Sequence, residues 1–388
     1  MTNFDKIIDR SGTGSIKYDR RKQVFGREDV LPMWVADMDF ESPSFVIDAI
    51  KKRLEHPVLG YTLRQDPFAD AFIGWANRRY SWDVKKCWLT FSPGVVPALV
   101  LSILAMTEEG DKIIIQPPVY APFFEAVEGN GRTLVTNPLK KDENGRYTMD
   151  FDDLEKKIDD RTKMIIISNP HNPVGRVWSE EELRTLGEIA LKHGLIIVSD
   201  DIHADFIYKG HKYTPIAKLD ERFADITVTA MSPSKTFNIA GLSTSIVVIP
   251  NEELRNKYNH KLMSAHLFLG NIFGGVAFEA AYNNGDQWLG ELLEYLEANI
   301  DYAVGYIREK IPSIKVWRPE STFLLWLDFS GTGLTHEEVK DKLINEALLG
   351  FNDGKTFGEG GEMHFRMNIA APRKVVEDAL GRLERVFG

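Results

Sequence analysis

Short runs of β-branched and other aliphatic residues recur along this chain, with helix-like segments between them. They cover residues 112–115, 133–135, 164–167, 195–198 and 245–249. The runs are continuous rather than alternating, which is the pattern of strands that are covered on both faces. Residues 180–192 place apolar side chains at helical spacing between two such runs, as in a βαβ unit. The pattern therefore predicts an α/β fold built on a parallel sheet.

The 388 residues are enough for a large domain and a smaller one. Residues 1–45 contain no long periodic segment and are predicted to form an arm associated with the smaller domain. Residues 46–284 are predicted to form the large domain. From residue 285 a long helical pattern passes through Leu289, Leu292, Leu293 and Leu296. Two strands at residues 314–317 and 322–329 and two more helices follow, so residues 285–388 are predicted to form a smaller α+β domain.

The charge balance and the cysteine count narrow the classes of function. The formal net charge of −10 argues against general binding to nucleic acid or to an anionic membrane, because both need a basic surface. No apolar run approaches the roughly 20 residues that span a bilayer. The single cysteine, Cys87, excludes an intrachain disulfide and fits a reducing compartment, so we expect a cytoplasmic protein. We predict no metal site.

Polar clusters follow several of the predicted strands. They lie at residues 92–94, 168–173, 200–203 and 232–235. In open α/β sheets, ligands bind beyond the carboxyl ends of the strands. The four clusters are therefore expected to converge on one edge of the sheet.

Lys235 lies just past a further predicted strand at residues 226–231, among small hydroxyl residues. A lone lysine is most often a solvated surface charge, but an amine at this edge suits a nucleophile that forms an imine with an aldehyde. Pyridoxal 5′-phosphate (PLP) is such an aldehyde. Its site also needs an acid at the pyridine nitrogen and donors for the phosphate. Asp200, at the end of another predicted strand, offers the acid.

The remaining groups that a PLP site needs are also present. Residues 94–96 open a helical pattern, so the amides of Val95 and Val96 could hold a phosphate. Ser232 and Ser234 could add hydroxyl donors, and Tyr120 could stack on the ring. Ordinary structural roles stay open, because a carboxylate after a strand often caps a helix and an aromatic side chain there is often part of the core.

Four segments resemble the motifs of fold-type I PLP enzymes in the class I/II aminotransferase superfamily, in particular those of the MalY/PatB group of cystathionine β-lyases. These segments are residues 33–40, 168–176, 199–205 and 232–242, in the order of the family. The resemblance implies a PLP-dependent transferase-like fold, with a mostly parallel seven-stranded sheet in the large domain. It also implies a homodimer with the active site at the subunit interface.

The resemblance implies a role for each matching residue. Lys235 resembles the Schiff-base lysine and proton shuttle, and Arg366 resembles the arginine that binds the substrate carboxylate. The residues implied to bind the cofactor are Val95, Val96, Tyr120, Asn172, Asp200, Ser232, Ser234 and Lys235, with Tyr61 reaching the neighbouring subunit's phosphate. Structural alternatives remain for Asn172, which could only turn the chain between two prolines, and for Arg366, which could be a salt-bridged strand residue.

Two further residues are predicted with an equal alternative. His203 stands three residues after Asp200, where many aminotransferases carry a tyrosine, and it is either a cofactor contact or a structural histidine. Trp34 either lines the substrate pocket or anchors the arm. Ser243 stands where many aminotransferases carry a phosphate-binding arginine.

The departures at His203 and Ser243 favour the lyase subgroup. The resemblance then implies β-elimination, in which cystathionine or a related cysteine S-conjugate yields a thiol, pyruvate and ammonia. Two alternatives stay open: an aminotransferase acting on an amino acid, and a PLP-binding protein that regulates a transcription factor by contact.

Overall fold

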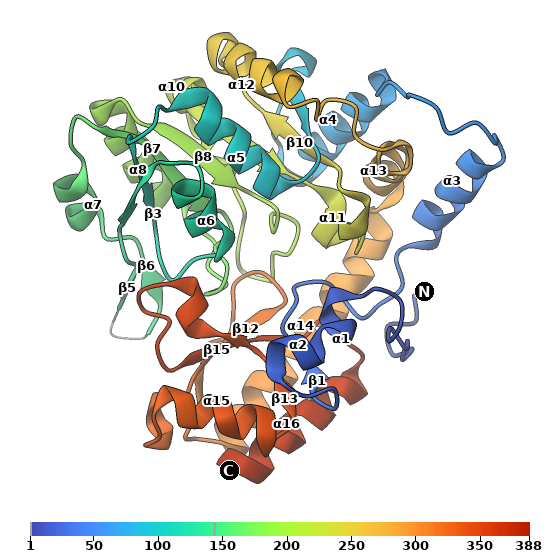
Figure 1. Cartoon of the computed structure of the whole chain (residues 1–388), viewed down its shortest axis with the longest axis vertical. Coiled ribbons are helices and arrows are strands. Elements are labelled where there is room, and N and C mark those ends of the chain that lie inside the picture. The colour runs from blue at the N-terminus through green and yellow to red at the C-terminus, as the bar shows by residue number, and fades with distance from the viewer. Residues whose placement is uncertain (1, 143–144) are drawn as a thin grey trace.

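A seven-stranded sheet forms the centre of the larger lobe (Figure 1). The computed structural model describes residues 2–142 and 145–388. The strand order is β2-β10-β9-β8-β7-β3-β4; β10 runs antiparallel to both neighbours, and the other pairs are parallel. The strands are β2 (Leu89–Ser92), β3 (Lys112–Ile115), β4 (Thr133–Thr136), β7 (Thr162–Ser168), β8 (Ile196–Asp200), β9 (Thr227–Met231) and β10 (Ser245–Val248). The predicted mostly parallel α/β sheet is confirmed.

Neighbouring residues of the central strands point into two different cores. In β3, Ile113 and Ile115 belong to one core while Ile114 belongs to the other. In β7, Ile166 and Ile165 divide in the same way. Because both faces of the sheet are covered, consecutive positions in the middle of these strands are apolar, which is why the runs read as continuous rather than alternating.

Helices cover both faces of the sheet. The helices around one face are α3 (Ser44–Leu54), α4 (Asp66–Tyr80), α5 (Val95–Met106), α6 (Pro122–Glu128), α12 (Glu252–Ser264) and α13 (Ile272–Asn284). The helices at the other face are α7 (Phe151–Lys157), α8 (Glu180–His193), α9 (Ile216–Leu219) and α10 (Glu221–Asp225). The predicted helix at 180–192 is α8, which starts with a capping box between Ser179 and Glu182 and stops at Gly194, where φ is 64°.

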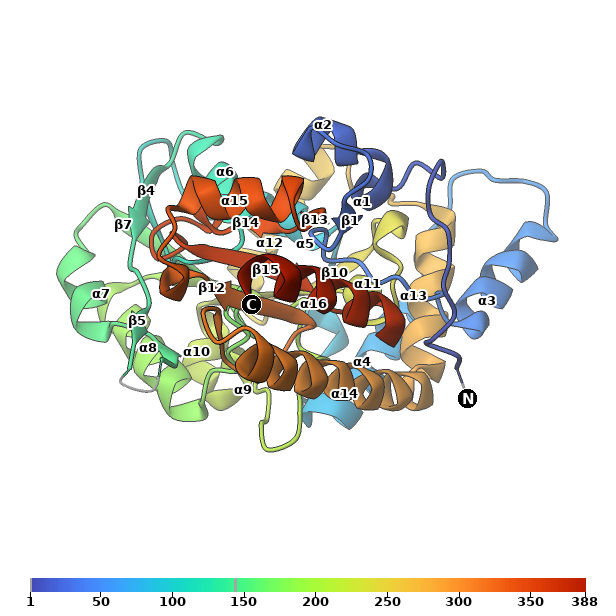
Figure 2. The ribbon, with the colours of Figure 1, turned by 90° about the horizontal axis from the view of Figure 1, so that it is seen from below.

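The smaller lobe is built on an antiparallel four-stranded sheet (Figure 2). Its order is β11-β12-β15-β14, with β11 (Lys315–Val316), β12 (Leu324–Asp328), β14 (Asn352–Asp353) and β15 (His364–Asn368). Its helices are α14 (Asp286–Lys310), α15 (His336–Asn345) and α16 (Arg373–Phe387). The predicted long helix and the two predicted strands correspond to α14, β11 and β12. The sequence did not predict β14 and β15.

The N-terminal arm lies against the smaller lobe (Figure 1). It contains α1 (Ile16–Asp19), α2 (Arg21–Phe25) and β1 (Leu31–Pro32), and β1 pairs in parallel with β13 (Leu349–Gly350). We propose the division that the sequence predicts, into an arm of residues 1–45, a large domain of 46–284 and a small domain of 285–388. The starts of α3 and α14 support it. The strands β5 (Lys140–Lys141) and β6 (Tyr147–Thr148) form a separate antiparallel pair.

Over residues 2–142 and 145–388, no helix combines the length and apolar character that crossing a bilayer requires.

Candidate active site

The carboxyl ends of four strands meet at one edge of the large sheet. Ser168 at the end of β7 pairs with Asp200 at the end of β8, and Asp200 pairs with Ala230 of β9. At the same edge β10 begins, with Ser245 opposite Ser92 at the end of β2. The four polar clusters predicted from the sequence therefore lie on one edge.

Lys235 reaches this edge from α11 (Pro233–Thr236), which follows β9 directly. Its amine donates a hydrogen bond to the carbonyl oxygen of Ala36 in the arm, with an Nζ–O distance of 2.7 Å. Burial lowers the pKa of Lys235 to about 8, and the charge of Arg366 lowers it further, while Asp37 and Asp200 oppose this. An amine with this pKa is partly neutral near neutral pH, as a nucleophile or proton acceptor must be.

Asp200 is a buried carboxyl group that forms no ion pair with any residue that the structure describes. Its Oδ1 accepts a hydrogen bond of 3.2 Å from the amide of Ile202. Burial raises the pKa of Asp200 to about 7, against the opposing effects of that amide and of Lys235. The neighbouring Asp201 instead accepts hydrogen bonds from the hydroxyls of Ser199 and Tyr213. Asp200 is therefore the carboxylate that remains available to a cationic ligand group.

Arg366, on β15, brings a second buried cation to the site. Its Nη1 donates to Oδ1 of Asn172 at 2.9 Å, and its Nη2 donates to the carbonyl of Trp34 at 3.0 Å and to Oδ1 of Asn352 at 2.7 Å. Its Nε is buried without a partner in the part of the chain that the structure describes. Burial lowers the pKa of Arg366 to about 10. Because its partners are all neutral, this guanidinium is suited to bind the carboxylate of a ligand.

His203 and Tyr120 lie among these charged groups. Burial lowers the pKa of His203 to about 3, and the charges of Lys235 and Arg366 act in the same direction, so the ring is neutral at neutral pH. Its Nδ1 has no partner among the described residues. Burial raises the pKa of the Tyr120 hydroxyl, with opposing contributions from Arg366 and Asp200. Their predicted contacts with the cofactor remain predictions.

Not every predicted phosphate donor has a hydrogen that is still available to a ligand. The helix α5 begins at Val95, and its N-cap residue Gly94 has no side chain to bond the first amides, including that of Val96. The hydroxyl of Ser232 donates to the carbonyl of Thr244 at 2.9 Å and accepts from the amide of Ser234 at 3.1 Å. The hydroxyl of Ser234 bonds to none of the described residues. Ser234 is therefore the better placed hydroxyl donor of the two.

Trp34 and Tyr61 are placed differently from the other predicted residues. The indole of Trp34 donates to the carbonyl of Lys17 at 3.0 Å and packs edge-on against Phe25, both within the arm, while its carbonyl accepts from Arg366. Tyr61 is 97% exposed, in the segment between α3 and α4. The structure therefore does not bring Tyr61 into this chain's own site.

Comparison with known proteins identifies the fold and the family. Residues 28–383 match the family described as aminotransferase class I and II. The chain belongs to this family. Cystathionine β-lyase PatB of Bacillus subtilis (strain 168) is 44% identical over 383 residues, which cover 98% of this chain and 99% of PatB. Protein MalY of Escherichia coli (strain K12) is 30% identical, over 99% of this chain and 98% of MalY. The predicted resemblance to the MalY/PatB group is confirmed.

A solved structure of the aminotransferase class I and II fold confirms the architecture. Cystalysin from Treponema denticola, a structure that contains a PLP cofactor, superposes with a TM-score of 0.96 at 34% identity. The similarity covers 100% of this chain and 98% of cystalysin. The fold type I expected from the sequence is therefore confirmed.

Residues 33–40 form a segment that we call the strap. The sequence did not predict the polar residues that hold this segment. Asn238 donates from Nδ2 to the carbonyls of Met38 and Phe40, at 2.9 and 2.8 Å. Asn368 bonds the strap from the other lobe. A single asparagine carries no periodic signal, and only the place of Asn238 three residues after Lys235 pointed to it. Within the described residues, no group of three or more His, Cys, Asp and Glu could hold a metal ion.

Proposed function

We propose that this protein is a PLP-dependent carbon–sulfur β-lyase, which cleaves cystathionine or related cysteine S-conjugates to a thiol, pyruvate and ammonia. The observation that carries the proposal is the buried guanidinium of Arg366, whose hydrogen-bond acceptors among the described residues are all neutral, beside the buried pair Lys235 and Asp200. The choice of a lyase is supported by the similarity to PatB, which is named a cystathionine β-lyase and aligns with 98% of this chain.

The residues of the site fit PLP. Asp200 offers a carboxylate without a cation to the pyridine nitrogen, and Lys235 offers an amine of lowered pKa to the aldehyde. The uncapped start of α5 offers the amides of Val95 and Val96 to the phosphate. Asn172 would bond the ring hydroxyl, and Tyr120 would cover the ring. Each of these groups of the cofactor would thus have a residue of matching chemistry as its partner.

When bound, PLP supplies an electron sink that stabilises negative charge at the Cα of the attached amino acid. Arg366 orients the substrate by a two-point pair between its guanidinium and the substrate carboxylate. Lys235 accepts the Cα proton at Nζ, because its pKa of about 8 keeps part of the amine neutral. Asp200 keeps a negative charge beside the ring nitrogen. The thiol then leaves from Cβ, and hydrolysis of the remaining fragment gives pyruvate and ammonia.

The experiment that tests the proposal is an assay of pyruvate release. The purified protein, loaded with PLP, receives cystathionine and other cysteine thioethers without any keto acid. A lyase releases pyruvate over many turnovers, and Lys235→Ala abolishes this release. An aminotransferase shares the cofactor residues but needs a keto-acid acceptor, so the proposal fails if cystathionine only converts the cofactor to its amine form and no pyruvate appears.

The active unit in this proposal is a homodimer with the site at the subunit interface. Tyr61 is 97% exposed, and the same segment exposes Val58, Leu59 and Leu63 by 63%, 56% and 80%. Neighbouring exposed apolar side chains are typical of a surface that another chain covers. A cytoplasmic location belongs to the same proposal, because the single cysteine, Cys87, is free and fits a reducing compartment.

A further inference from the structure

The backbone of the strap lies between the two cations of the site. The carbonyl of Trp34 accepts from Nη2 of Arg366 at 3.0 Å, and the carbonyl of Ala36 accepts from Nζ of Lys235 at 2.7 Å. The carbonyls of Val35 and Asp37, which alternate with these two along the strap, bond to neither cation among the described residues.

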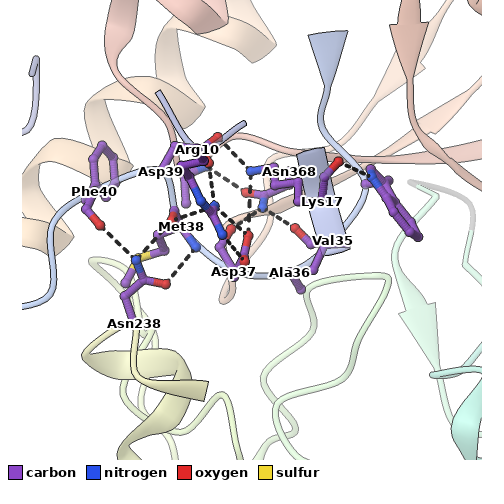
Figure 3. A network of polar contacts seen from close by, with 12 residues as sticks. Arg10, Lys17, Val35, Ala36, Asp37, Met38, Asp39, Phe40, Asn238 and Asn368 are labelled. Carbon is purple, nitrogen blue, oxygen red and sulfur yellow. Dashed lines mark hydrogen bonds and ion pairs between the residues drawn. The ribbon is translucent and has the colours of Figure 1, made fainter. Parts of the chain in front are cut away.

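Asn368 binds these alternate carbonyls of the strap (Figure 3). Its Nδ2 donates to the carbonyls of Val35 and Asp37, both at 2.7 Å. Its Oδ1 accepts from the amide of Ala370 at 2.8 Å, and its own amide donates to the carbonyl of Met33 at 2.8 Å. Asn368 is 1% exposed, and both hydrogens of its side-chain amide bond to the strap. The carbonyl of Ala36 is thus held between the two carbonyls that Asn368 fixes.

The rest of the strap is held by other groups. Arg10 pairs with Asp37 at 2.6 Å, and the buried amine of Lys17 pairs with Asp39 at 2.7 Å (Figure 3). Asn238 holds the carbonyls of Met38 and Phe40 from the larger lobe. Asn368 differs from these groups because it stands two residues after Arg366 on β15, so both side chains point to the same face of the strand.

We propose that Asn368 is a positioning residue. It holds the strap so that the carbonyls of Trp34 and Ala36 accept from Arg366 and Lys235, and it thereby sets the substrate carboxylate at a fixed place relative to the amine that moves the proton. The inference rests on the roles that the proposed function gives to Arg366 and Lys235. Asn368 touches neither cation itself.

Two consequences follow from the hydrogen bonds. A carbonyl that accepts from the lysine ammonium favours its charged form, so a displaced Ala36 carbonyl leaves Lys235 with a lower pKa. A displaced Trp34 carbonyl leaves the guanidinium of Arg366 less firmly oriented, so the substrate carboxylate binds more weakly. Loss of one such bond corresponds to about a five- to tenfold change in an equilibrium constant.

The test compares Asn368→Ala with the wild type in two measurements. The pKa of Lys235 is obtained in the full-length, cofactor-free protein from the pH dependence of its carbamylation by cyanate, read at residue 235 by mass spectrometry. We expect a decrease of about half a unit or more. The second measurement is KM for cystathionine in the PLP-loaded enzyme, where we expect an increase of about five- to tenfold.

Asn299→Ala is the matched control. Asn299, buried on α14, also donates from Nδ2 to two carbonyls, those of Ile369 and Ala371, at 3.2 and 3.0 Å, but none of its hydrogen bonds within the described residues goes to the strap. Both variants should lower Tm, whereas only Asn368→Ala should change the pKa of Lys235. Equal pKa values in the two variants, or an unchanged pKa in Asn368→Ala, would overturn the inference.

If Asn368→Ala does not fold, Asn368→Ser replaces it. A serine hydroxyl donates one hydrogen bond instead of two, so the shift of the Lys235 pKa should be smaller but in the same direction, and no shift overturns the inference. The cyanate measurement needs no lyase turnover. A shifted pKa in a protein that releases no pyruvate would therefore refute the proposed function and leave the role of Asn368 intact.

Discussion

At the scale of single residues, the adjacent carboxyl groups of Asp200 and Asp201 differ in the hydrogen-bond donors around them. Burial raises the pKa of both to about 7. Asp201 accepts hydrogen bonds from Ser199 and Tyr213, whereas among the described residues Asp200 accepts one bond, from the amide of Ile202. A buried carboxylate is costly unless a cation or donors compensate it. The buried charge of Asp200 therefore destabilises the folded protein, and a bound pyridinium group would compensate this charge.

This cost predicts how pH changes the stability of the cofactor-free protein. The pKa of Asp200, about 7 in the folded state, lies above its value of 3.8 in the unfolded chain. As pH rises from about 4 to about 7, the unfolded chain releases this proton while the folded protein keeps it, so stability falls. Asp200→Asn removes the ionisation and can still accept from Ile202. We expect Asp200→Asn to melt above the wild type at pH 8 and close to it at pH 4, without PLP.

Addition of PLP should reverse this order at pH 8. The ring nitrogen pairs with a charged Asp200 in the wild type but not with the asparagine, so only the wild type should gain the full increase in Tm. Asp201→Asn is the control, since it should lose Tm through its hydroxyl partners and still gain from PLP. An equal gain from PLP in Asp200→Asn and the wild type would contradict the assignment of Asp200.

At the scale of elements, the turn from β9 into α11 has two serines with separate tasks. Ser232 caps α11, while the hydroxyl of Ser234 has no partner in the part of the chain that the structure describes. We expect Ser232→Ala to lower the free energy of unfolding of the cofactor-free protein by about 1 kcal/mol, and with it Tm, because α11 loses its cap. We expect Ser234→Ala to leave that Tm unchanged and to weaken PLP binding about fivefold or more, measured by fluorescence titration. Unchanged PLP affinity in Ser234→Ala would contradict a phosphate contact.

The elements that the sequence predicted are those whose pattern reflects burial alone. Residues 113–115 of β3 are all isoleucine because both faces of this strand are covered. In β15, Phe365 and Met367 alternate with polar residues, as in a strand with one face in water. Yet Arg366 and Asn368 are 4% and 1% exposed, because their face meets the strap. The alternation of apolar and polar residues therefore did not show that the polar face of this strand is buried, and β15 was not predicted.

At the scale of the whole molecule, the site is assembled from three parts of the chain. The larger lobe supplies Lys235 and Asp200, the smaller lobe supplies Arg366, and the arm supplies the carbonyls of Trp34 and Ala36. Residues at strand ends could be predicted, because the fold class fixes where such ends lie. Contacts made by backbone carbonyls could not be predicted, because every residue has a carbonyl and the residue type does not show which carbonyls bind a side chain.

One further part of the site is expected from a second subunit, and subunit mixing tests it. Tyr61 is exposed in one chain, so Lys235→Ala and Tyr61→Ala should each inactivate their own homodimers. In a mixed dimer, the Lys235 of one subunit meets the Tyr61 of the other, which restores one of the two sites. Random pairing of equal amounts makes about half of the dimers mixed, so about a quarter of the wild-type activity should return. If Tyr61 served its own subunit, no mixture would recover any activity. The readout is pyruvate release after the two variants are unfolded and refolded together, with separately refolded samples as the control.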